Sequence, residues 1–319
     1  MHAPTALKTF QLKIEVLTNQ YVRIRSIMAY ALFIFSTSAI AASERGILYV
    51  VESKDGRQIG CVVGTIHTHT ATDEFLGKFV KHCGRRGQIV IMEVAPPVSR
   101  EAALKEQNQI DALTNPAVPS KFRSDQLAII QSNTTRLMAV GLDAQALGKL
   151  PIWQSSFSVA LADMNQFLPS PRVNMEQQLF ASLSKVGVSA TLGLERAIDQ
   201  IQPYARLSYE DQVYMLSRSI ANLGTTRTKV FLAAIVDAWL IGDHEKVLSS
   251  LDRYSQSARE RRLADQTIFV RNAPLVKALE RSIAGEARPF TLMIGALHLG
   301  KSSGVLAYFS GAGYRLRQA

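Results

Sequence analysis

The chain has 319 residues, of which 47% are hydrophobic and 19% are charged, so its composition is that of a globular protein and excludes a disordered one. Its 36 Lys and Arg residues outnumber its 26 Asp and Glu residues, giving a formal net charge of +10. The basic residues form no stripe interleaved with aromatic side chains, so we expect no nucleic acid partner.

The N-terminal segment, residues 1–41, has the three-part pattern of a secretory signal peptide. Four basic residues and one acidic residue precede the short apolar run Ile27 to Phe35, and the segment ends in Ala39-Ile40-Ala41. We predict export to the periplasm or the medium, with a mature chain of residues 42–319 whose charge falls by three, to +7. An uncleaved membrane anchor is the alternative, because the basic region is long. We expect no membrane span in the mature chain, since no later segment approaches the roughly 20 apolar residues required.

The mature chain opens with strand signals. Residues 47–51 and 59–66 are rich in β-branched residues and flank an Asp-Gly turn, which predicts a hairpin. A capping box at Thr70 to Asp73 predicts a helix over about 72–83. The apolar run 89–92 then predicts a strand that stops at Glu93, before two prolines. This strand, helix and strand unit predicts parallel neighbours joined by a right-handed crossover.

The middle of the chain has helical periodicity. It recurs around 123–140, 153–167, 175–186, 208–222, 227–241 and 262–282, with one short strand expected at 188–194. Strand patterns return at 290–294 and 313–317, on either side of a helix that ends near Ser310. We therefore predict an α/β fold: a mixed central sheet built from both chain ends, in a single domain of residues 42–319 with a large helical insertion at about 100–285.

The sequence contains two cysteines, Cys61 and Cys83. In an oxidising compartment such a pair can form a disulfide. The alternative is that Cys61 is a small, apolar core residue within its strand.

Four predicted strands each end in a side chain able to bind a metal: His67, Glu93, Glu195 and His298. Ligands of open α/β sheets bind outside the carboxyl ends of the strands. Both histidines occur in a Gly-x-x-His pattern, Gly64 to His67 and Gly295 to His298. Imidazole and carboxylate are common ligands of a catalytic divalent metal. The pattern predicts a metal site, with zinc, manganese or cobalt as the ion.

Each candidate also has a structural interpretation. A lone histidine at a strand end is more often structural, but two in matched settings beside a carboxylate favour a site. Glu93 is the stronger carboxylate, because a charge after four apolar residues needs a partner or a ligand. Glu195 could instead be an acid at a helix N-terminus. His69 is a weaker candidate ligand, and a loop histidine is the more frequent role for such a residue.

Other catalytic motifs are missing from the sequence. There is no Gly-x-Ser-x-Gly elbow, no His-Glu-x-x-His and no Walker loop. An amidohydrolase barrel using His67 and His69 would need eight strands, which the helical middle does not supply.

In the order and spacing of its motifs, the chain resembles the TraB/PrgY/GumN family, which includes the animal Tiki proteases. The resemblance covers about Ile47 to Arg317 and rests on Gly64-Thr-Ile-His67, Glu93, Gly193-Leu-Glu195 with Gln200, Ala238 to Asp243, Arg271-Asn272, Gly295-Ala-Leu-His298-Leu with Gly304, and Gly313-Tyr314.

The resemblance implies a fold similar to erythromycin esterase and the ChaN-like proteins, and metal-dependent hydrolysis of a peptide. His67, Glu93 and His298 would form the metal site, with Glu93 or Glu195 as general base. Arg271 would stabilise an oxyanion or hold a carboxylate. Lys301 departs from the family pattern, where a small residue is usual. The substrate is expected to be a peptide or a small molecule, and the alternative function is non-catalytic capture of a secreted peptide in the envelope.

Overall fold

A computed structural model describes residues 44–67, 69–97, 99–114, 118–167 and 173–319. The predicted signal peptide, with Ala39-Ile40-Ala41, lies outside the described residues. Within the described ranges, no helix is long and apolar enough to cross a membrane.

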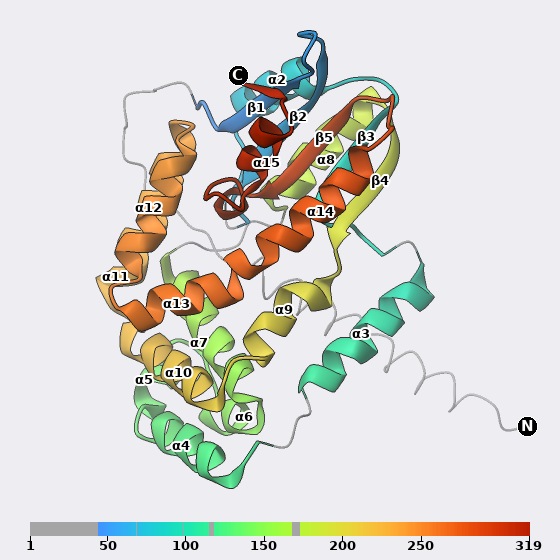
Figure 1. Cartoon of the computed structure of the whole chain (residues 1–319). Helices are drawn as coiled ribbons and strands as arrows, with labels where there is room; N and C mark the ends of the chain where they lie inside the picture. The colour runs from blue at the N-terminus through green and yellow to red at the C-terminus, as the bar shows by residue number, and fades with distance from the viewer. Residues whose placement is uncertain (1–43, 68, 98, 115–117, 168–172) are drawn as a thin grey trace, which may run out of the picture.

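A six-stranded mixed sheet forms the upper part of the molecule in Figure 1. Its strands are β1 (Ile47–Glu52), β2 (Gln58–Thr65), β3 (Gln88–Val94), β4 (Val188–Glu195), β5 (Phe290–Gly295) and β6 (Arg315–Gln318), in the order β4-β3-β5-β2-β1-β6. The predicted α/β fold, with a sheet built from both chain ends, is therefore confirmed.

The four strands β4, β3, β5 and β2 are mutually parallel, whereas β1 is antiparallel to both β2 and β6. The expectation that β2 and β3 are neighbours was wrong, because β5 lies between them and pairs with both. Five of the six residues of β5 are buried, so this apolar strand from the C-terminal part of the chain takes the protected central place.

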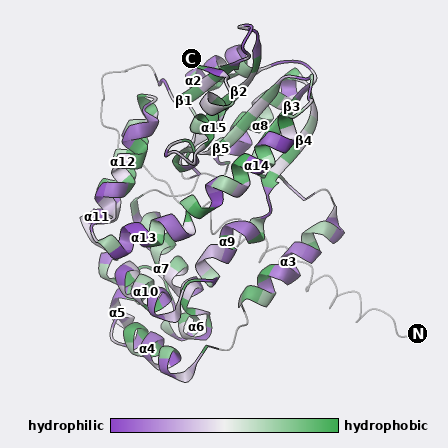
Figure 2. Ribbon diagram, in the orientation of Figure 1, coloured by the Kyte–Doolittle hydropathy of each residue, from purple (hydrophilic) through white to green (hydrophobic). Residues whose placement is uncertain are grey.

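Helices cover both faces of the sheet. In Figure 1, α14 (Asn272–Ile283) passes in front of it and α8 (Met175–Val186) behind it. The predicted first helix is α2 (Asp73–Cys83), whose N-cap Thr72 accepts a hydrogen bond from the backbone N–H of Phe75. It packs against α8 and β1, while α15 (Val305–Gly311) packs against α14 and β6. In Figure 2, hydrophobic and hydrophilic bands alternate along α12 and α14, as in helices with one buried face.

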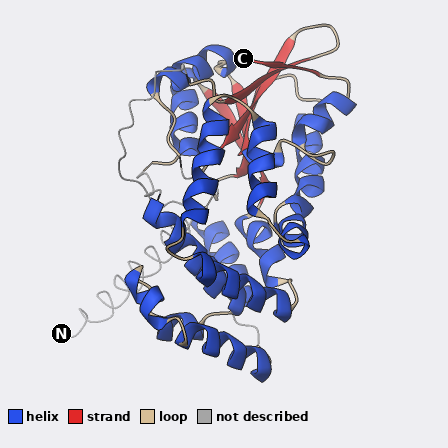
Figure 3. Cartoon of the chain, turned by 90° about the vertical axis from the view of Figure 1, so that its left-hand side faces the viewer, coloured by secondary structure: helices blue, strands red, loops and turns tan. Residues whose placement is uncertain are grey.

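The helical insertion gathers at the other end of the molecule, below the sheet in Figures 1 and 3. Eight of its residues form a small core of their own, centred on Ile130, Ile152 and Leu216. Its remaining helices are α3 (Arg100–Thr114), α4 (Ser120–Gln131), α5 (Thr134–Ala139), α6 (Ala144–Lys149), α7 (Ile152–Phe167), α9 (Ala197–Ala205), α10 (Tyr209–Asn222), α11 (Thr226–Leu240), α12 (His244–Tyr254) and α13 (Ala258–Thr267).

Two of the predicted helices are interrupted. The stretch 123–140 divides into α4 and α5 at Ser132 and Asn133, whose side chains bond to the preceding carbonyls. The stretch 262–282 divides where α13 ends and a short 3-10 turn, Phe269–Arg271, precedes α14. This second break matters for function, because it carries Arg271.

A disulfide joins Cys61 on β2 to Cys83 at the end of α2, with a Cα–Cα distance of 5.6 Å. Cys61 is also fully buried, so it belongs to the core as well as to the bridge. The bond ties the first helix to the strand that precedes it.

Candidate active site

The carboxyl ends of the four parallel strands bring the predicted residues to one edge of the sheet. His67 lies two residues beyond β2, Glu93 is the penultimate residue of β3, and Glu195 is the last residue of β4. His298 closes the 3-10 turn Ala296–His298, directly after β5. The neighbours β2 and β5 pair Thr65 with Gly295, so their two Gly-x-x-His segments lie side by side.

Both glycines of these segments are required by close approaches. A Cβ atom on Gly64 would lie 2.6 Å from Cδ1 of Leu299, the residue after the second histidine. A Cβ on Gly295 would lie 3.1 Å from Oε2 of Glu93, 3.6 Å from Cδ2 of His298 and 3.9 Å from Nε2 of His67. The three predicted metal-site residues therefore surround the space beside Gly295, which only glycine leaves open.

Glu93 is held from three sides. Its Oε1 accepts hydrogen bonds from Arg271 and from Nε2 of Gln200, the latter at 2.9 Å. Its Oε2 accepts the backbone N–H of Gly295 at 2.9 Å. Nε2 of His298 lies 3.7 Å from Oε1. The Glu93 carboxylate is thus fixed between Arg271, Gln200 and Gly295, at the carboxyl end of its strand, as the sequence predicted.

Each histidine has its Nδ1 atom against an oxygen from a helix. Nδ1 of His67 lies 2.7 Å from Oε1 of Glu176, in the first turn of α8. Nδ1 of His298 lies 2.6 Å from Oδ1 of Asn272, at the start of α14. Such partners fix the orientation of an imidazole and leave its Nε2 free for a ligand.

The two histidines differ in their electrostatics. The negative charge of Glu176 outweighs burial and raises the pKa of His67 to about 9. His67 is 41% exposed in its side chain, and it lines the cavity described below. Burial lowers the pKa of His298 to about 4, against the opposing charge of Glu93, so this imidazole is neutral near pH 7.

Arg271 and the two carboxylates form a buried charge group. The Arg271 side chain is 13% exposed and contacts Glu93 and Glu195, with Nε 3.1 Å from Oε2 of Glu195. Burial alone would raise the pKa of Glu93, but the charges of His298, Arg271 and His67 lower it overall. Burial raises the pKa of Glu195, with Arg271 opposing the shift. Glu195 contacts Arg271 and is not among the residues that line the cavity.

A cavity of about 420 Å³ adjoins this group. His67, Glu93, Gln200, Arg271 and His298 form its polar end. The other walls are largely apolar and come from the helical insertion, mainly α7, α9 and α11. The sheet edge and the insertion together therefore make one site, polar where the strands end and apolar beyond.

The donor chemistry of this site fits a divalent metal. Two imidazoles with oriented Nδ1 atoms and one carboxylate surround the space beside Gly295, which is a typical donor set for zinc or manganese. The side chains are not arranged in a coordination shell, however. Over the described part of the chain, no group of three or more His, Cys, Asp and Glu residues is arranged to hold an ion.

The other polar residues considered from the sequence lie away from the cavity wall. His69 packs edge-to-face on Trp239, with ring centroids 5.5 Å apart, and burial lowers its pKa. Lys301 pairs with Asp265 at 2.7 Å and does not line the cavity. The departure from the family pattern at Lys301 therefore lies outside the cavity lining.

Three supporting residues were not predicted in these roles. Glu176 and Asn272 orient the histidines, and Trp239 donates from Nε1 to the carbonyl oxygen of Gly64 at 2.6 Å, which holds the end of β2. Asn272 and Trp239 occur in the motifs of the family resemblance. Glu176 had only one signal, its place in the first turn of a predicted helix.

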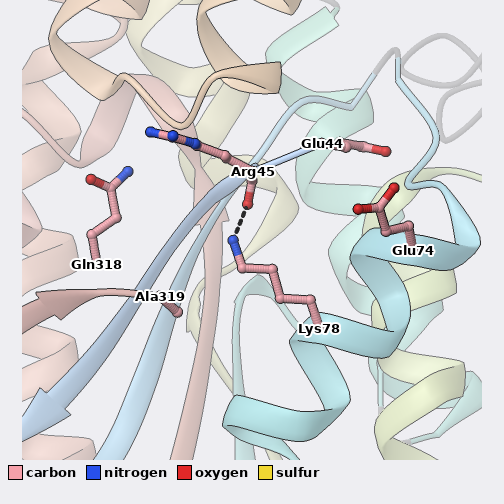
Figure 4. A pocket seen from close by; sticks show the side chains of 6 residues that line it. All are labelled: Glu44, Arg45, Glu74, Lys78, Gln318 and Ala319. Atoms are coloured by element: carbon pink, nitrogen blue, oxygen red, sulfur yellow. Dashed lines mark hydrogen bonds between the residues drawn. The ribbon is translucent and has the colours of Figure 1, made fainter. Parts of the chain in front are cut away.

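A second hollow lies where the start of β1 and the end of β6 meet α2, and it is shown in Figure 4. Glu44, Arg45, Glu74, Lys78 and the C-terminal residues Gln318 and Ala319 line it. Nζ of Lys78 donates to the backbone carbonyl of Arg45 at 2.9 Å. None of the histidines lines this surface hollow, so the cavity beside His67 is the stronger candidate.

The comparison with protein families matches the TraB/PrgY/gumN family model over residues 47–318. The chain belongs to the TraB/PrgY/gumN family. The match spans both Gly-x-x-His segments, Glu93, Glu195 and Arg271, so the whole site lies within the family region. No curated protein and no solved structure matches the chain.

Proposed function

We propose that this protein is an exported, metal-dependent hydrolase that cleaves a peptide bond or a related carbonyl bond. The observation that carries the proposal is the meeting of His67, Glu93 and His298 around the space beside Gly295, at the polar end of a cavity. The disulfide between Cys61 and Cys83 supports export, because such bonds persist in oxidising compartments.

His67, Glu93 and His298 would hold the divalent ion. When bound, the ion would supply a water molecule of lowered pKa and a Lewis acid for the carbonyl oxygen. We assign Glu93 as a metal ligand rather than as the general base, because its lowered pKa makes it a weak base near pH 7. Glu176 and Asn272 would keep the two imidazoles in their ligating orientation.

Arg271 would stabilise the negative charge that develops on the carbonyl oxygen. It lines the cavity, and its bonds to Glu195 and Glu93 outweigh burial and raise its pKa, so it stays cationic. Glu195 lies behind it, and we assign this carboxylate to holding the guanidinium rather than to proton transfer.

The alternative function is capture of a secreted peptide without catalysis. The observation that favours it is the engagement of Glu93 by Arg271, Gln200 and Gly295, which leaves this carboxylate fully partnered without an ion. A peptide bound at the same cavity would then remain intact.

Turnover and binding of a peptide mixture separate the two functions. The test incubates wild type and His298→Ala with peptides, with zinc, manganese or cobalt, and follows products by mass spectrometry. If the protein is a hydrolase, wild type should produce peptide fragments and His298→Ala should not. If wild type retains peptides intact with every metal and His298→Ala binds them equally well, the protein is a binding protein.

A further inference from the structure

The apolar part of the cavity has features that the hydrolase proposal does not use. Thirteen of its lining residues are aliphatic or aromatic residues on helices of the insertion. On α7 these residues recur at helical spacing, as Trp153, Phe157, Leu161 and Met164. On α11 they are Phe231, Leu232, Ile235 and Val236. Two helix faces therefore form a continuous apolar wall.

Within this wall lie a buried donor and a buried acceptor on adjacent residues. Nε1 of Trp153 and Oε1 of Gln154 have no hydrogen-bond partner among the described residues. The Trp153 side chain is almost wholly buried, with 6% of the residue exposed, and both residues line the cavity. Burying such groups unpaired is unfavourable, so each is available to a ligand. One is a donor and the other an acceptor, the two kinds of partner that a secondary amide needs.

The polar capacity of the cavity limits what can occupy it. Every residue of a peptide brings one backbone N–H and one carbonyl oxygen, and each needs a partner once buried. At the polar end, Gln200 and Arg271 already bond to Glu93, and His298 bonds to Asn272. Between the apolar helices, an occupant with one amide and an otherwise apolar chain is therefore satisfied, whereas each further peptide group buried there would need a partner that Trp153 and Gln154 do not supply.

We propose that the cavity binds an N-acyl amide, with its acyl chain packed between α7, α9 and α11 and its single amide recognised by Trp153 and Gln154. The apolar walls stabilise the chain by removing it from water. Nε1 of Trp153 donates to the amide oxygen, and Oε1 of Gln154 accepts the amide N–H. The amide site lies next to the proposed metal residues but does not use them. The two proposals can therefore be tested separately.

Binding of two matched probes tests this proposal. N-methyloctanamide carries an amide N–H, whereas methyl octanoate has the same chain and a carbonyl oxygen but no N–H. Isothermal titration of wild type should give an affinity roughly tenfold higher for the amide, because the ester leaves Oε1 of Gln154 unpaired. In Gln154→Met this preference should fall to about twofold or less, while Gln166→Met, an exposed residue of α7, should retain it.

A cavity-filling variant provides the second measurement. Ala160 lines the cavity, so Ala160→Leu should weaken both probes, whereas Ala233→Leu, on the exposed side of α11, should not. Equal binding of amide and ester by wild type, or no binding of either, would overturn the proposal. Tighter binding of acetyl-Leu-Leu-Leu-amide than of N-methyloctanamide would also overturn it, in favour of a peptide.

Discussion

Glu176, from helix α8, holds the imidazole of His67, with 2.7 Å between Oε1 and Nδ1. This contact joins a helix on one face of the sheet to the segment that follows β2. The negative charge of Glu176 raises the pKa of His67, and the contact at Nδ1 leaves Nε2 directed away from Glu176. Glu176 is therefore a positioning residue for the proposed metal site.

Glu176→Gln should weaken metal binding while the fold persists. Glutamine keeps the size of the side chain but removes the charge that orients His67, and loss of such a partner typically lowers metal affinity roughly 10- to 100-fold. Titration of the purified protein with manganese or zinc measures the change. Glu74→Gln, at an exposed position of α2, is the control and should bind as wild type does. Equal affinity in all three proteins would remove Glu176 from this role.

Gly295→Ala should abolish the site with little effect on stability elsewhere. The added methyl group would lie 3.1 Å from Oε2 of Glu93 and within 4 Å of both histidines, in the space assigned to the ion. We expect loss of bound metal and of any hydrolysis, measured by elemental analysis and peptide turnover. Gly311→Ala is the matched control, because a Cβ there meets nothing within 4 Å. Full metal occupancy in Gly295→Ala would contradict the assignment.

Loss of the disulfide should destabilise the protein measurably. The bond between Cys61 and Cys83 spans 22 positions, and closing a loop of that length contributes about 3 kcal/mol to the free energy of unfolding. Denaturant unfolding of wild type should therefore shift to lower concentration when a reductant is added. The double variant Cys61→Ala and Cys83→Ala should show no such response. A wild type insensitive to reductant would argue against the bond.

Acid should weaken the ion pairs that join α10 to α13. The Asp211 carboxylate, 9% exposed, bonds to Arg262 and Arg259, which lower its pKa from 3.8 to about 2. A lowered folded-state pKa stabilises the protein above about pH 4, and the contribution is lost as pH falls through about 2.

Asp211→Asn should thus lower the free energy of unfolding by about 1–2 kcal/mol at pH 7, with a difference from wild type that shrinks as pH falls below about 4. Urea unfolding at a series of pH values measures it. Asp252→Asn, at an exposed position of α12, should change little across the same range. A destabilisation by Asp211→Asn that is unchanged at pH 2 would be inconsistent with an ionised carboxylate as its source.

The sequence predicted the site residues because their positions follow from local rules. Strands of apolar residues ending in His67, Glu93 and Glu195 can be recognised within a few residues of the chain. Parallel strands place their carboxyl ends at one edge, so the meeting of these side chains required only that the strands share a sheet. The glycines of the two Gly-x-x-His segments indicated places of close packing, but the sequence did not show which atoms pack there.

What the sequence left unpredicted depends on long-range contacts. No local pattern places β5 between β2 and β3, because strand order is decided by which apolar strand gains most from burial on both faces. The same holds for Glu176, since an acid in a first helical turn has the same pattern whether it faces water or an imidazole. The apolar stripe of α7 likewise fits a core helix as well as a cavity wall.

Elemental analysis of the purified mature protein tests the central claim most directly. Wild type, His67→Ala and His298→Ala would be dialysed without chelator and their metal content measured. The proposed site predicts near-stoichiometric zinc, manganese or cobalt in wild type and its loss in both variants. Wild-type protein that retains no metal, even after each ion is added back, would contradict the metal-dependent hydrolase and leave peptide capture as the better account.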